Sequence, residues 1–268
     1  MNPFRRIVQS ARLSLAAKAN LAVRIEYSKL SLPGNRQDNQ DRVDVFAAES
    51  AALLVVVDGM GGHAQGARAA EVTVRTLSEC FADEGAAVLD PQGFLTLALA
   101  HAHARVVELG SGVAMDHKPR ATCAVCLVQD GSAYWAHVGD SRIYQLRLGQ
   151  VHERTRDHSH VELLLREGVI AEREMKSHPM RNFVECCLGG DTPLPNMSIS
   201  ARKRLREGDV LVACTDGLWS GVDDEDIATL ADGTAPLDRA LSALAERAVA
   251  SNSPHSDNTS AVALRWMG

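Results

Sequence analysis

Several aspartates in this sequence stand where a run of apolar residues begins or ends. The run Leu53–Val57 leads directly into Asp58. Such a run predicts a buried strand, so its carboxylate would lie at the rim of a core, where a ligand can reach it. Three other acids stand at similar junctions, two after apolar runs and one before the last run of the chain: Asp140, Asp216 and Asp257.

Carboxylates that gather in one place repel one another and are pushed toward protonation unless a cation neutralises them. A site made only of oxygen ligands favours Mg²⁺ or Mn²⁺ over Zn²⁺. The glycines after Asp58, in Asp58-Gly59-Met60-Gly61-Gly62-His63, would also let the backbone approach a ligand closely. A single Asp-Gly pair is typical of an ordinary turn, and the inference depends on several such junctions together.

Five segments in this order resemble the protein phosphatase 2C family, the metal-dependent serine/threonine phosphatases, and particularly its bacterial branch. They are Arg36-x-x-Asn39-Gln40-Asp41, Asp58 to His63, Gly139-Asp140-Ser141-Arg142, Asp216-Gly217 and Asp257-Asn258. The segment Thr155-x-Asp157-His158-Ser159 is similar to a further part of that family. The resemblance spans about residues 21–266, and the ordered set is far more specific than any one member.

The resemblance implies a site for two Mn²⁺ or Mg²⁺ ions. Asp58 would bridge the two ions, and the carbonyl of Gly59 would complete one ion's ligands. Asp216 and Asp257 would hold the other ion, and Asp41 would act nearby, largely through bound water. Two metal ions lower the pKa of a water between them and neutralise charge on phosphoryl oxygens.

The same resemblance implies hydrolysis of phosphoserine and phosphothreonine in proteins by direct attack of water. Arg36 would grip the substrate phosphate, since a guanidinium presents a planar fork to two oxygens. His63 would be the general acid that protonates the departing alkoxide. Phosphorylated proteins would be the substrates, and a eukaryotic-like serine/threonine kinase would be the opposing enzyme.

The chain departs from the family pattern at one position that concerns the metals. Many members have an aspartate four residues after the position of Asp216, and this chain has Ser220. Asp140 would therefore bind a third ion more weakly or with more water ligands.

Composition limits the alternatives. The net charge of −6 argues against the basic surface of a nucleic-acid binder. A regulator that only binds phosphoproteins is a second hypothesis, but it has no need of the intact set of acids with Arg36 and His63. Six cysteines are expected to be reduced thiols, as in a cytoplasmic protein, because Cys123 and Cys126 lie three apart on a predicted strand and face opposite sides.

The elements that would position these residues come as runs of strands with pairs of helices between them. Strands are predicted at 21–27, 42–48, 53–57, 121–129, 132–138, 141–148, 151–155, 197–201, 210–214 and 259–266. Helices are predicted at 63–81, 94–109, 160–167, 172–176, 223–230 and 236–250. This order favours an α+β layered sandwich over a doubly wound parallel sheet. The family resemblance narrows it to a four-layer α-β-β-α sandwich, a central antiparallel β-sandwich flanked by helices.

The first 20 residues are interpreted as a basic amphipathic extension before a single phosphatase domain at 21–268. Five basic residues and no acid fall in residues 1–25, and Phe4, Ile7, Val8, Ala11 and Leu15 share one face of a predicted helix. Such a segment could be a helix that packs on the domain or frays, a helix that docks to a partner or to a membrane surface, or an organelle transit peptide. No run approaches the roughly 20 apolar residues that span a bilayer.

Overall fold

The computed structural model of the chain describes residues 7–13, 24–61, 63–85, 87–175 and 177–268. Every strand pair in these ranges is antiparallel. The first sheet contains, in spatial order, β1 (Ile7–Leu13), β2 (Ile25–Leu32), β15 (Thr259–Trp266), β14 (Val210–Cys214), β9 (Arg142–Arg147) and β10 (Gln150–Arg154).

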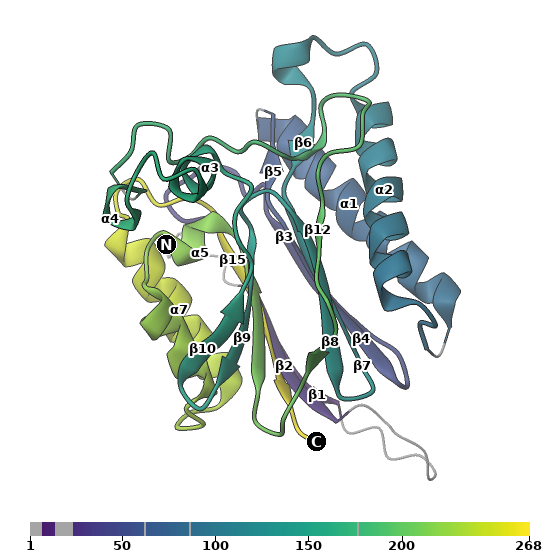
Figure 1. The fold of residues 1–268 in the computed structure, drawn as a ribbon, viewed down its shortest axis with the longest axis vertical. Coiled ribbons are helices and arrows are strands. Elements are labelled where there is room, and N and C mark those ends of the chain that lie inside the picture. The colour runs from purple at the N-terminus through teal and green to yellow at the C-terminus, as the bar shows by residue number, and fades with distance from the viewer. Residues whose placement is uncertain (1–6, 14–23, 62, 86, 176) are drawn as a thin grey trace.

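The second sheet faces the first across the centre of the molecule (Figure 1). Its order is β12 (Ser198–Ile199), β8 (Ser132–Val138), β7 (Cys123–Gln129), β4 (Ala51–Val57) and β3 (Arg42–Ala47), and β13 (Lys203–Arg204) also pairs with β8. A small third sheet contains β11 (Leu188–Gly189), β6 (Arg120–Ala121) and β5 (Gly59–Met60).

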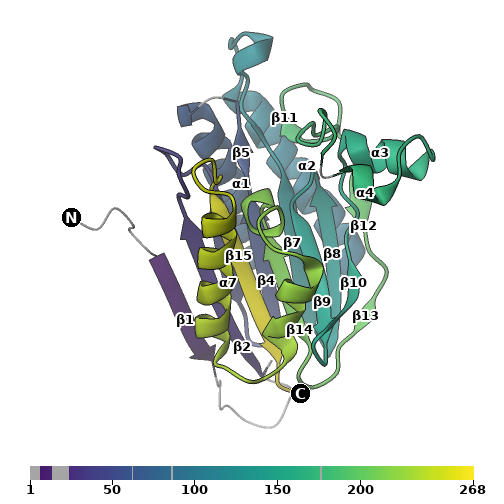
Figure 2. The same ribbon diagram turned by 90° about the vertical axis from the view of Figure 1, so that its left-hand side faces the viewer.

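Helices cover the outer faces of the two large sheets. The helices are α1 (His63–Glu84), α2 (Pro91–Leu109), α3 (His160–Arg166), α4 (Glu172–Met175), α5 (Asp216–Trp219), α6 (Asp224–Ala228) and α7 (Leu237–Ser251), with 3₁₀ turns at Met115–His117 and Thr229–Ala231. The pair α1 and α2 packs on the second sheet, and Figure 2 shows α7 lying across the first.

Three apolar clusters show why the layers form. Strand β4 is apolar throughout because both of its faces are buried. Leu53, Val55 and Val57 pack toward α1 and α2, whereas Leu54 and Val56 pack between the two sheets. A third cluster joins the first sheet to α7. Successive residues of a strand point to opposite faces, so one short run supplies two adjacent layers.

The predicted four-layer α-β-β-α sandwich is therefore confirmed. The Asp130-Gly131 turn joins β7 to β8 with positive φ at both residues, 49° and 63°, as a tight hairpin requires. Cys123 packs toward the helices and Cys126 packs between the sheets, as their spacing on a strand predicts. Within the described ranges, no helix is both long enough and apolar enough to cross a membrane.

The helix predicted for the first 20 residues is wrong over Ile7–Leu13, which form β1. This strand pairs with β2 over seven residues, from Ile7 opposite Ser31 to Leu13 opposite Ile25. The outer edge of β2 would otherwise present unpaired backbone groups, and a strand satisfies them where an amphipathic helix cannot. Residues 1–6 and 14–20 lie outside the described ranges. The division into an extension and a domain at residue 20 stays a prediction.

Candidate active site

Five aspartates far apart in the sequence act on one another electrostatically at one end of the sandwich. Asp58 lies between β4 and β5, Asp216 begins α5 directly after Thr215, and Asp140 lies between β8 and β9. Asp41 precedes β3, and Asp257 lies just before β15. The charges of the other four all act on Asp58.

Close backbone contacts at glycine explain how the chain brings these acids together. At Gly217 a Cβ atom would lie 2.1 Å from the carbonyl oxygen of Asn258, so any larger residue would push these two segments apart. At Gly59 a Cβ would lie 2.0 Å from the carbonyl oxygen of Gly66 in α1. The first contact holds Asp216 beside Asp257, and the second seats the strand after Asp58 against the start of α1.

The acids perturb one another's protonation. Desolvation and then the charges of Asp41, Asp216, Asp140 and Asp257 raise the pKa of Asp58 well above its usual range. The pKa of Asp216 is raised in the same way, by desolvation and then by the charges of its acidic neighbours. Both side chains remain partly accessible to solvent, so a ligand can reach them.

The pKa values of Asp41 and Asp140, which are more deeply buried, are also raised. Desolvation raises the pKa of Asp41 to about 6, although hydrogen bonds from Ser260 and Thr215 oppose the shift. Desolvation and then the charge of Asp157 raise the pKa of Asp140 to about 7. These carboxylates therefore carry a mutual repulsion that hard cations would remove, and their oxygen-only chemistry suits Mg²⁺ or Mn²⁺.

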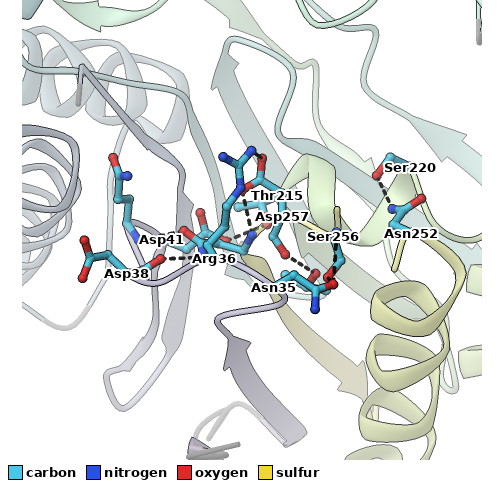
Figure 3. Close-up of polar contacts among 12 residues, drawn as sticks. Asn35, Arg36, Asp38, Asp41, Thr215, Ser220, Asn252, Ser256 and Asp257 are labelled. Atoms are coloured by element: carbon cyan, nitrogen blue, oxygen red, sulfur yellow. Dashed lines mark hydrogen bonds and ion pairs between the residues drawn. The ribbon is translucent and has the colours of Figure 1, made fainter. Parts of the chain in front are cut away.

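The side chains are near one another without forming a finished ligand cage. Among the described residues, no three side chains of His, Cys, Asp and Glu make a preassembled cation-binding group. Two of the acids are turned toward other partners. The Thr215 hydroxyl donates to Asp41 Oδ2 at 2.9 Å, and Arg36 Nη2 donates to Asp257 Oδ2 at 2.8 Å (Figure 3).

Asn258 connects the loop that carries Arg36 to the strand that follows Asp257. Its Nδ2 donates to the carbonyl oxygens of Pro33 at 3.0 Å and Asp38 at 2.9 Å. Its Oδ1 accepts from the backbone N–H of Gln40 at 2.8 Å. One amide side chain thus fixes residues 33–40 against β15.

The loop of Asp140 is held by histidine and by a buried ion pair. Gly139 has φ of +99°, its N–H donates to His158 Nδ1 at 3.2 Å, and its carbonyl accepts from the His158 N–H at 2.8 Å. Arg142 makes two bonds to Asp157, with Nε–Oδ1 2.8 Å and Nη2–Oδ2 2.7 Å. The Arg142 guanidinium also lies 3.7 Å from the centre of the Trp219 ring.

A cavity of about 550 Å³ is lined in part by His158. Its walls come from the connection between β10 and α3, from α3, from the segment between α4 and β11, and from the start of β12, and they include Asp157, His158, Glu162, Arg166, Glu185 and Ser198. His158 therefore contacts both the Asp140 loop and the cavity.

The structure brings Arg36, Asp41, Asp58, Asp140, Asp216 and Asp257 into one region, while their predicted roles as ligands or phosphate contacts stay predictions. His63 begins α1, and its side chain lies outside the described part of the chain. Gly59 is buried in β5, and its carbonyl lies close to Gly66.

Sequence reasoning assigned no role to Thr215, Asn258 or Ser260, although all three bond to residues of this region. Thr215 and Asn258 stand directly beside predicted ligands, and that adjacency was the one signal that could have found them. Ser220, where the family often has an acid, accepts a hydrogen bond from Asn252 Nδ2 at 2.9 Å.

The chain is similar in sequence to known proteins. The family profile described as protein phosphatase 2C matches residues 34–253. A serine/threonine phosphatase of Listeria monocytogenes serotype 4b, named stp, is 30% identical over 198 residues, which are 72% of this chain and 77% of that protein.

Two solved structures extend the comparison to the fold. The serine/threonine phosphatase Stp1 from Staphylococcus aureus has a TM-score of 0.83 at 28% identity, over 94% of this chain and 99% of that one. The catalytic domain of the serine threonine protein phosphatase PstP, solved in complex with two manganese ions, has a TM-score of 0.71 at 25% identity over 99% of both chains.

Proposed function

The chain belongs to the protein phosphatase 2C family, and on that premise we propose that it hydrolyses phosphoserine and phosphothreonine in proteins with two divalent cations. The observation that carries the proposal is that acids from separate segments gather at one end of the sandwich, where desolvation and then the charges of neighbouring acids raise the pKa of Asp58 and Asp216. Acids that only stabilise a fold are normally paired with cationic side chains or with hydrogen-bond donors.

Asp58 and the Gly59 carbonyl would hold one Mn²⁺ or Mg²⁺, and Asp216 and Asp257 would share the other with Asp58, with Asp41 nearby. The manganese complex of the similar PstP domain supports this choice of ion. The cations would neutralise charge on the phosphate and lower the pKa of a bound water. Hydrolysis of a phosphate monoester is so slow without a catalyst that a single acid or base could not replace them. Partial exposure of Asp58 and Asp216 leaves room for a phosphate to approach.

Arg36 would bind the phosphate of the substrate. Its side chain is 57% exposed and lies at Asp257, so it can reach an incoming group at the same position. A guanidinium fork gives two parallel hydrogen bonds to phosphoryl oxygens and orients the ester for attack by water. His63, at the start of α1, would deliver the proton to the leaving alkoxide.

Asp140 would contribute to a third, weaker ion. Ser220 offers one neutral hydroxyl, already bonded to Asn252, where many family members supply a carboxylate. Fewer charged ligands mean a lower affinity for a hard cation. A serine/threonine kinase would supply the phosphoproteins. A cytoplasmic location would agree with six cysteines that are all unpaired.

The test is a phosphatase assay on phosphoserine, phosphothreonine and phosphotyrosine peptides, with Mn²⁺, with Mg²⁺ and with EDTA. We expect cation-dependent release of phosphate from the first two peptides and a much lower rate on the third. Equal turnover in EDTA, or activity on phosphotyrosine alone, would contradict the proposal.

A further inference from the structure

The contact between Arg36 and Asp257 gives one arginine two competing partners. Arg36 Nη2 lies 2.8 Å from Asp257 Oδ2, and both side chains are partly exposed, 57% and 41%. The proposed function assigns Asp257 to a metal ion and Arg36 to a phosphate. A carboxylate oxygen that accepts from a guanidinium is not free to ligate a cation with the same lone pair.

The backbone around this pair is fixed, so the contact can change only through the side chains. The Asn35 N–H donates to the Ser256 carbonyl at 3.0 Å, and the Ser256 hydroxyl donates to Asn35 Oδ1 at 2.7 Å. Gly34 approaches so closely that a Cβ there would lie 2.1 Å from the Asp257 carbonyl oxygen. Figure 3 shows the contacts of Asn35 with Ser256 and of Arg36 with Asp257.

We propose that Arg36 is an internal counter-ion of the metal site, which competes with the cation for Asp257 and leaves it when a phosphate binds. The inference rests on the proposed function and concerns how that site is loaded. The cation must displace the guanidinium, so Arg36 lowers cation affinity in the absence of phosphate. A phosphate monoester that takes the guanidinium frees Asp257, so phosphate and cation bind cooperatively, and by linkage each strengthens the other.

The size of the effect follows from the exposure of the pair. Exposed ion pairs contribute about 0.2–1 kcal/mol. Removal of the guanidinium should therefore tighten cation binding by about 1.4- to fivefold, a gain of affinity that accompanies a loss of phosphate binding. An arginine that acted on the cation through its charge alone would give the same gain with or without the Asp257 carboxylate.

The experiment is calorimetric titration of Mn²⁺ into protein stripped of metal, without any substrate. We expect Arg36→Ala to bind Mn²⁺ about 1.4- to fivefold more tightly than the unaltered chain, with Arg36→Lys between them. The matched control is Arg247→Ala. It removes an arginine of similar exposure, 53%, from a 2.7 Å pair with Asp226 on the surface of α7 and α6. Its Mn²⁺ affinity should not change.

A double-mutant cycle separates direct contact from a general effect of positive charge. In an Asp257→Asn background the gain from Arg36→Ala should disappear, because the contested carboxylate is gone. A gain that persisted there, or an Arg36→Ala protein that bound Mn²⁺ no better than the unaltered chain, would overturn the proposal and leave the phosphatase assignment standing.

The phosphate half of the exchange is tested with phenylphosphonate, a monoester analogue that is not hydrolysed. It should raise Mn²⁺ affinity more in the unaltered chain than in Arg36→Ala, and an equal rise in both would overturn the exchange. Failure of the unaltered chain to bind Mn²⁺ at all would instead count against the proposed function itself.

Discussion

Two buried aspartates near opposite ends of strand β14 have pKa values shifted in opposite directions. Asp209, just before the strand, is 1% exposed, and Asp41, which accepts from Thr215 just after the strand, is 2% exposed. Desolvation alone would raise the pKa of Asp209, but hydrogen bonds from Arg147, the Arg206 N–H and Gln145 lower it overall. Desolvation raises the pKa of Asp41 to about 6 despite its hydroxyl donors.

The difference lies in the partners of the two acids, and it is the one expected if Asp209 stabilises the fold and the other acids bind a ligand. At the Asp209 end, Arg147 Nε and Nη2 bond both carboxylate oxygens at 2.7 and 2.6 Å, so the charge is neutralised inside the protein. At the Asp41 end, the acidic neighbours of Asp58 leave a repulsion in place. The two acids are therefore equally shielded from solvent, but only Asp209 has a cationic partner that lowers its pKa.

The largest expected effect comes from removing the central acid. Asp58→Asn should lower hydrolysis of p-nitrophenyl phosphate by several orders of magnitude at saturating Mn²⁺, because the side chain that would bridge both cations loses its charge. Asp209→Asn is the matched control at the other end of β14, and its activity per folded molecule should be unchanged. Near-full turnover by Asp58→Asn would defeat the assignment of the site.

The second prediction reverses the comparison and measures stability. Asp209→Asn should lower the free energy of unfolding by about 3 kcal/mol, because it leaves the Arg147 guanidinium without its buried counter-charge. Asp41→Asn, measured without metal, should leave stability unchanged or raise it, because it removes a charge from a repelling group. Urea denaturation followed by circular dichroism measures both. Equal losses at the two ends would mean that the difference in partners has no energetic consequence.

Added metal should stabilise the protein through the acids around Asp58 and not through Asp209. A ligand at 100 times its dissociation constant stabilises a folded protein by about 2.7 kcal/mol. Mn²⁺ at that level should raise the melting temperature of the EDTA-treated protein, and Asp216→Asn should abolish most of the rise. Asp209→Asn starts from a lower melting temperature but should show the full increment. An increment of the same size in Asp216→Asn would show that Mn²⁺ binds elsewhere.

The sequence supports this division only in part. The apolar runs beside Asp58 and Asp216 predict buried strands with acids at their ends, because local hydrophobicity determines burial. The fourfold layering follows in the same way, since β4 and β7 are apolar on both faces. The Arg147–Asp209 pair has no such signal, because it joins the end of β9 to the residue before β14, 62 positions away, and the register of these strands is set by the whole sheet.

Contacts between distant loops also could not be predicted from the sequence. Asn258 bonds to Pro33 and Asp38, more than 200 residues away, and the pairing depends on β15 lying beside β2. At Ile7–Leu13 the local pattern predicted the wrong secondary structure, a helix in place of a strand. Its spacing suits a helix face over a short window, yet an open sheet edge nearby decides its conformation. Local pattern predicts burial well and partners poorly.

The smallest predicted effect concerns Asp140, whose loop is held by a neutral ring. Desolvation and then the neighbouring His137 lower the pKa of His158 to about 4, against about 6.5 for an unfolded chain. Because the folded form resists protonation, the stability that His158 contributes is complete above pH 6.5 and is lost as the pH falls from 6.5 toward 4.

His158→Asn keeps an acceptor for the Gly139 N–H and cannot titrate. Its free energy of unfolding should fall less steeply across that window, by at most about 1.4 kcal/mol per pH unit, the slope of one proton. Asp157 and His137 remain in both proteins, so the difference between the two slopes isolates His158. Identical slopes in urea titrations between pH 4 and 7.5 would show that the pKa of His158 is the same in the folded and the unfolded protein, so that the ring gains its charge beside the Asp140 loop below about pH 6.5.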